Sequence, residues 1–417
     1  MEYKTPLFTD EMKKDYTILL PNMAITQFTL LKACFNSEGY HAELLQNSGS
    51  EVSQLGLKYV HNDTCYPALL VIGQFIDALN KGNYDLHKVA LIITQTGGGC
   101  RASNYLKLLR KALVKSGYGY IPVASLNFSN LEKESSIHLT PRFTLKMIAA
   151  IFYGDLLVAL RNQVHPYETN RGDADKMRDK WLAIISNWIQ NNSHYMLPTL
   201  QGVFEQIIKD FASIPVKKEK KVKVGIVGEI YVKFSPLGNN ELEKFLESQD
   251  CEVNIPSLMG FISYCVANQT IDYSFYGGKK SKATISNMLL KIIDHILKKQ
   301  AKVLRQYGFY APGPFKEMLE KPKGIISLGV KMGEGWLLPA EMVELIEGGY
   351  PNIVCAQPFG CLPNHIVGKG VISKIRKLYP NSNITPIDYD PSATKVNQEN
   401  RIKLMLAIAK ENLQTTE

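Results

Sequence analysis

The chain has 417 residues, a length that allows about three domains of ordinary size. Hydrophobic residues make up 45% and charged residues 21%, while 30 glycines and 20 prolines are too few for a collagen-like or disordered chain. The net charge of +9 comes mostly from scattered lysines that cluster only at residues 217–223, without interleaved aromatic residues. We therefore predict a globular protein that does not bind nucleic acid.

The cellular location is predicted from what the chain lacks. The longest apolar stretch, residues 147–154, ends at Asp155 and is much shorter than the ~20 residues of a membrane-spanning helix. The first residues alternate charged and apolar side chains, unlike a signal peptide. Seven cysteines, an odd and low number, do not indicate a secreted disulfide framework. We expect a cytoplasmic protein without a membrane partner.

Residues 1–140 alternate between β-branched runs and helical patterns. Strands are predicted at 16–21, 42–45, 89–94 and 121–124, and helices at 25–35, 66–80 and 102–115. This alternation is typical of one α/β layer, so residues 1–140 are predicted to form an N-terminal α/β domain.

The rest of the chain divides into three further regions. Residues 141–215 are predicted to be mainly helical, and the charged residues 216–223 mark a boundary. A second α/β and helical region follows at 216–320, and a C-terminal α/β region at 321–417. Their predicted strands lie at 224–227, 325–328, 353–355 and 384–387, and their predicted helices at 241–249 and 281–307. The expected fold is α/β, with two or three subdomains of parallel sheets and flanking helices, and no sequence repeat at a fixed period.

Three cysteines stand where a loop is expected to lead into a helix: Cys65 in NDTCYPALL, Cys100 in TQTGGGCRASNY and Cys361 in QPFGCLPNHIVGKG. Pro67 and Pro363 each follow a cysteine by two residues, near the first helical turn, where a missing N–H is tolerated. A helix N-terminus favours a thiolate. Three thiolates that converge at the carboxyl ends of strands would form a cage for an iron–sulfur cluster.

The glycines beside these cysteines, Gly98, Gly99 and Gly360, are candidates for close backbone approach to such a cluster. Cys355, at the end of a predicted strand, is a candidate fourth ligand, although core packing explains it equally well. Small buried thiols are the alternative for all of these cysteines. The absence of a CxxC pair argues against a zinc ribbon and a ferredoxin-type cluster.

Three polar residues are candidates for supporting roles. His365 lies four residues after Cys361, on the same helical face, where it could donate a hydrogen bond or a proton. Arg101 and Asn104 follow Cys100 and could stabilise an anionic cluster or a substrate carbonyl. Helix capping, packing or simple exposure would also explain all three. Neither GxGxxG nor GxxxxGK[ST] occurs at the GGG, so we predict no ATP site in this chain.

Four stretches resemble a known family: NDTCYPALLVIGQFIDAL, ITQTGGGCRASNY, VGIVGEIYVKFSPLGNNELEKFLE and VCAQPFGCLPNHIVGKG. Together they look like the 2-hydroxyacyl-CoA dehydratase component family, and more closely like its branch related to the acyl-CoA dehydratase activases. The resemblance spans most of residues 15–410 and covers the dehydratase-like part alone.

This resemblance implies α/β subdomains with parallel sheets, whose cysteines hold a 4Fe–4S cluster between the subdomains. It also implies paired subunits that form a homo- or heterodimer. The family's cysteine sites fall on Cys65, Cys100 and Cys361, with Cys355 as the less secure fourth. In the dehydratases an ATP-hydrolysing activator injects one electron at low potential, and the ketyl radical of a 2-hydroxyacyl-CoA then loses water. Because no ATPase module is evident here, the activator is expected to act in trans.

The resulting hypothesis is an iron–sulfur enzyme of the 2-hydroxyacyl-CoA dehydratase type, a lyase with an acyl-CoA substrate. His365 or Arg101 would then assist the leaving hydroxyl or hold the thioester carbonyl. Three alternatives remain open. They are a double-cubane reductase of small molecules, a non-catalytic electron carrier, and an α/β binding protein with buried thiols and no iron.

Overall fold

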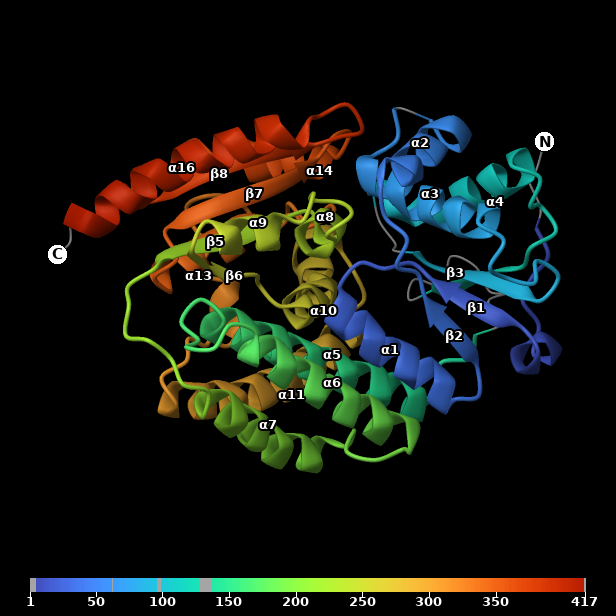
Figure 1. The fold of residues 1–417 in the computed structure, drawn as a ribbon, viewed down its shortest axis with the longest axis horizontal. Helices are drawn as coiled ribbons and strands as arrows, with labels where there is room; N and C mark the ends of the chain where they lie inside the picture. The colour runs from blue at the N-terminus through green and yellow to red at the C-terminus, as the bar shows by residue number, and fades with distance from the viewer. Residues whose placement is uncertain (1–4, 62, 96–98, 128–136, 416–417) are drawn as a thin grey trace.

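The computed structural model describes the chain except residues 1–4, 62, 96–98, 128–136 and 416–417. Two four-stranded, all-parallel sheets lie in different parts of the molecule, and a layer of long helices runs below them in Figure 1. This arrangement confirms the predicted α/β fold with parallel sheets and flanking helices.

The first sheet has the strand order β2-β1-β3-β4. Its strands and the helices that connect them, shown in blue and cyan at the right of Figure 1, are β1 (Thr17–Leu20), α1 (Ile25–Ser37), β2 (His41–Leu44), α2 (Ser50–Tyr59), α3 (Tyr66–Asn80), β3 (Val89–Gln95), α4 (Tyr105–Lys115) and β4 (Val123–Asn127). Two short 3-10 helices, η1 (Glu11–Lys14) and η2 (Arg101–Asn104), precede β1 and α4. Alternate side chains of β1 face opposite cores: Ile18 packs with α1, and Leu19 packs with α3.

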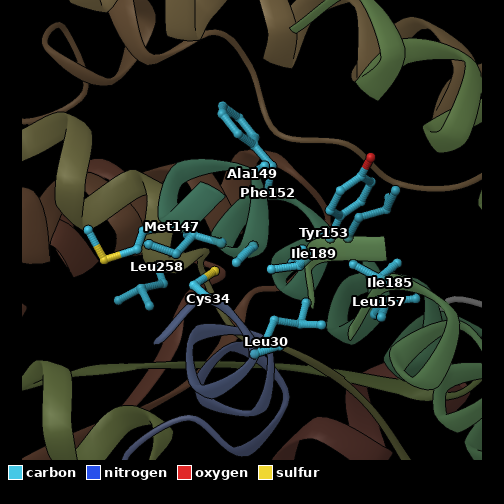
Figure 2. Close-up of a cluster of buried hydrophobic side chains, with 14 of the residues drawn as sticks. Leu30, Cys34, Met147, Ala149, Phe152, Tyr153, Leu157, Ile185, Ile189 and Leu258 are labelled. Atoms are coloured by element: carbon cyan, nitrogen blue, oxygen red, sulfur yellow. The ribbon is translucent and has the colours of Figure 1, made fainter. Parts of the chain in front are cut away.

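The helical layer consists of α5 (Pro141–Val164), α6 (Asp173–Gln190), α7 (Leu197–Ala212), α10 (Leu258–Tyr276) and α11 (Lys280–Gln306). Figure 2 shows its core, where Leu30 and Cys34 of α1 lie beside side chains of α5 and α6. Trp181 and Ile185 of α6 are buried in the same core, as their spacing predicted. Cys34 is therefore a core residue.

Helix α5 is the one described helix that is long and apolar enough to cross a membrane, and two thirds of its apolar window, 67%, is buried inside the protein. It includes Asp155, which is half-buried and accepts hydrogen bonds from Gln27 Nε2 (2.8 Å) and from the backbone N–H groups of Leu258 (3.1 Å) and Met259 (2.8 Å). These contacts make α5 a packing helix of the core.

The second sheet has the order β6-β5-β7-β8, which repeats the topology of the first sheet without a repeated sequence. Its strands are β5 (Val222–Gly228), β6 (Cys251–Asn254), β7 (Asn352–Pro358) and β8 (Asn383–Tyr389). The helices around it are α8 (Ile230–Phe234), α9 (Leu242–Ser248), α12 (Phe315–Met318), α13 (Leu337–Glu347), α14 (Leu362–Asn364), the π-helix η3 (His365–Lys369), α15 (Ile372–Leu378) and α16 (Lys395–Thr415). The regions 216–320 and 321–417 thus share one sheet.

The strand predicted at 325–328 is wrong, because this segment forms turns. The backbone N–H groups of Ile325 and Ile326 both bond to the carbonyl of Pro322, and Gly324 has a positive φ of 76°. Both isoleucines pack onto neighbouring cores from the turn itself. Their apolar character therefore reflects burial and does not require strand pairing.

Candidate functional site

The candidate site lies where the carboxyl ends of the two sheets meet. Cys65 is the N-cap of α3, Cys100 follows β3, and Cys361 follows β7 as the N-cap of α14. β3 and β7 occupy the same position in their two sheets. The topology therefore brings cysteines from distant segments to one interface, which is where open α/β sheets bind ligands.

The two halves are in direct backbone contact beside Cys65. The N–H of Tyr66 donates to the carbonyl of Phe359, 3.1 Å away. Gly360 has a φ of 75°, and a Cβ added there would lie 3.3 Å from Cys65 Cα. Glycine is required by this conformation and is favoured by this close approach.

The electrostatic environment links the three thiols. The pKa of Cys100 is raised to about 11, chiefly by burial and also by the nearby Glu334, Cys65 and Glu229. Burial, Glu334 and Glu229 raise the pKa of Cys361 as well. Burial also raises the pKa of Cys65, whereas the hydroxyl of Tyr105 lowers it. Desolvation thus opposes the thiolates expected at the helix starts. Binding of a metal would favour the thiolate form of each cysteine.

Two buried carboxyl groups, which the sequence analysis did not select, border the thiols. Glu229 follows β5 and accepts the N–H of Val232 (2.9 Å), which caps α8. Glu334, in the loop before α13, accepts the N–H of Ile230 (3.0 Å). Burial and the charge of Glu334 raise the pKa of Glu229 to about 8. The signal that could have found Glu229 is an acidic residue directly after a buried strand.

Two polar groups contact the sulfur atoms. The hydroxyl of Tyr105 lies 3.4 Å from Cys65 Sγ. Nδ2 of Asn364 lies 3.3 Å from Cys361 Sγ and also donates to Glu334 Oε2 at 2.7 Å. Each of these two thiols therefore has a neutral hydrogen-bonding partner, and neither partner was predicted.

The predicted supporting residues lie at different places around the thiols. Arg101 is exposed, and its charge lowers the pKa of Cys65, so it lies at the rim of the site. Asn104 is half-buried before α4 and does not cap that helix. The N–H of Gly99 donates to Met332 Sδ (3.3 Å), whereas Gly98 lies outside the described residues.

His365 is half-buried directly after α14. Its backbone N–H bonds to the carbonyl of Cys361 (3.2 Å), but its side chain makes no hydrogen bond to the described residues. The local helix therefore holds the backbone of His365 against that of Cys361, but its imidazole is not hydrogen-bonded to Glu229 or Glu334, the two described carboxyl groups beside the thiols.

Cys355 has different surroundings from the other three cysteines. It is fully buried in the core between β7 and α13, with Leu338 and Val367. Its sulfur accepts from Gln357 Nε2 at 3.5 Å, and the ionisable groups around it are Lys369, Asp388 and Glu341. This environment agrees with the core-packing alternative.

The candidate donors are three thiols that come from separate elements. Within the described part of the chain, no three or more His, Cys, Asp or Glu side chains form a group that could hold a metal ion. A 4Fe–4S cluster would bind each thiolate at a different iron, so it would not need the three sulfur atoms to meet at one atom. The amide oxygen of Asn364 is buried beside Cys361 and has no hydrogen-bond partner among the described residues, which leaves an acceptor at the site.

Comparisons with known proteins do not add a family. The sequence matches no protein-family model, and a search of the curated proteins finds no match. The functional argument therefore depends on the site.

Proposed function

We propose that this chain is an iron–sulfur protein of the 2-hydroxyacyl-CoA dehydratase type, with Cys65, Cys100 and Cys361 as ligands of a 4Fe–4S cluster. One observation carries the proposal. Two parallel sheets of the same topology bring three cysteines from distant segments to their shared interface, at helix starts and beside buried polar groups. Ordinary core packing of thiols does not need this arrangement, as Cys34 and Cys355 illustrate.

The bound cluster would supply low-potential one-electron transfer to an acyl-CoA. The residues of this chain would do the rest. Arg101, at the exposed rim, would hold the thioester carbonyl. Glu229 would keep a proton near neutral pH, because burial and Glu334 raise its pKa, and could give it to the leaving hydroxyl. His365 was the expected proton donor, but Glu229 is the better candidate because it lies near enough to all three thiols to affect their pKa values.

The proposal also names the partners. The electron would come from an ATP-hydrolysing activator acting in trans, and the working form would be a homo- or heterodimer in the cytoplasm. Four irons with three cysteine ligands leave one iron without a cysteine ligand, and an open position is what substrate binding requires.

Single substitutions test the ligand assignment. Cys65→Ser, Cys100→Ser and Cys361→Ser should each lower the iron bound by anaerobically purified protein, because each removes one thiolate. Cys34→Ser is the control, since Cys34 is a buried thiol that lies in the core of the helical layer. Equal iron in all four variants would contradict the assignment.

A further inference from the structure

Two polar side chains contact the sulfur atoms of the candidate ligands from different parts of the fold. Tyr105, the first residue of α4, lies on the side of the first sheet. Asn364, the last residue of α14, lies on the side of the second. The Tyr105 hydroxyl is 3.4 Å from Cys65 Sγ, and Asn364 Nδ2 is 3.3 Å from Cys361 Sγ. Because a ligating thiolate can only accept, both side chains would donate to it.

These donors are held in place by their surroundings. Asn364 is fully buried, and its amide is fixed by its bond to Glu334 Oε2, whose partner oxygen accepts the N–H of Ile230. Tyr105 packs against the core of the first sheet, and its hydroxyl bonds to the sulfur of Cys65. A donor held by such contacts keeps its direction when the charge on the sulfur changes.

The sulfur ligands become more negative when a cluster accepts an electron. A hydrogen bond to a ligating sulfur stabilises the more negative, reduced state more than the oxidised state, which raises the reduction potential. The buried carboxyl groups of Glu229 and Glu334, when ionised, act in the opposite direction because their charge repels the added electron. The potential is then set by the balance between the two kinds of group.

We propose that Tyr105 and Asn364 are positioning residues that raise the reduction potential of the cluster through hydrogen bonds to Cys65 and Cys361. This inference rests on the proposed function, because it requires the cluster. It goes further by naming the residues that set its potential.

Tyr105→Phe is the sharpest test, since it removes one oxygen atom from an otherwise unchanged side chain. The equilibrium between oxidised and reduced cluster, followed by EPR at controlled potentials, should shift about tenfold toward the oxidised state. This shift corresponds to 59 mV for a one-electron couple. Asn364→Leu, which keeps the branched shape of the side chain but removes the donor, should shift the potential in the same direction.

Two controls separate this effect from general loss of packing. Tyr153→Phe removes a buried hydroxyl that bonds to the carbonyl of His194 (2.7 Å), and Asn352→Leu removes an amide that bonds to the carbonyl of Lys223 (3.0 Å). Both lie away from the thiols and should leave the potential unchanged.

The possible results separate a failure of this inference from a failure of the proposed function. Full iron content with an unchanged potential in Tyr105→Phe would overturn the inference and leave the proposed function standing. Loss of iron from Tyr105→Phe would also overturn it, because Tyr105 would then hold the cluster in place. Absence of iron from the wild-type protein would overturn the inference and the proposed function together.

Discussion

The buried ion pair beside the site offers a direct test of its electrostatics. Lys233 of α8 lies 3.0 and 3.2 Å from the two carboxylate oxygens of Glu341 on α13, and both side chains are almost fully buried, at 2% and 3% exposure. The same ammonium group opposes the burial that raises the pKa values of Glu229 and Glu334. We predict that Lys233→Met destabilises the protein strongly.

The size of this destabilisation follows from the burial of Glu341, which would be left without its partner. Removal of one member of a buried pair costs about 3–5 kcal/mol, whereas replacement of both by apolar residues is often neutral or stabilising. Lys233→Met should therefore lower the free energy of unfolding by about 3–5 kcal/mol near neutral pH. The double variant Lys233→Met/Glu341→Met should recover most of this loss.

The loss should also depend on pH. Burial raises the pKa of Glu341 above its ordinary value of 4.5, and loss of Lys233 would raise it further. A carboxyl group with a raised folded pKa does not destabilise the fold below the unfolded value, where both states are protonated, and destabilises it as the pH rises. The deficit of Lys233→Met should therefore shrink as the pH falls toward 4.5.

Urea unfolding of the full chain, followed by circular dichroism at several pH values, measures both effects. Wild type, Lys233→Met and the double variant are compared under identical conditions. A loss below about 1 kcal/mol, or a loss that does not change with pH, would refute the buried-pair reasoning.

Three further predictions concern other parts of the fold. Burial raises the pKa of Asp155 from 3.8 to about 6. The free energy of unfolding of the wild type should therefore fall by about 3 kcal/mol between about pH 4 and about pH 6, and Asp155→Asn should remove this fall. Unfolding measured against pH for both proteins checks this. Gly228→Ala should prevent stable folding, seen as loss of the cooperative thermal transition, because Gly228 has a φ of 144° and an added Cβ would collide with the carbonyl oxygen of Ala356. Cys355→Ser should keep its iron while lowering the melting temperature, since Cys355 lies in the core; a loss of iron equal to that of Cys361→Ser would make Cys355 a ligand.

The sequence predicted those elements whose cause is local. The helix expected at 66–80 is observed as α3, because an apolar run follows a cysteine and a proline that suit a helix start. The short strand β6 and the helix α10 were not predicted. Burial of α10 depends on contacts with α5, α11 and the loop before α13, which no local pattern reveals.

The candidate site, too, could be predicted only where the signal is local. The three cysteines could be selected from Gly and Pro neighbours, but their supporting groups could not. Glu334 becomes part of the site only through its contacts with Ile230 and Asn364, which are 104 and 30 residues away in the chain. Tyr105 reaches Cys65 across 40 residues. Such pairings are products of the tertiary fold, so sequence spacing gives no signal for them.

The most direct test of the central claim is the iron and acid-labile sulfide content of protein purified without oxygen, with EPR spectra before and after dithionite. The account predicts about four irons and four sulfides per chain and a spectrum that changes on reduction. Protein that contains no iron, even after anaerobic reconstitution, would contradict the account and leave an α/β binding protein with buried thiols.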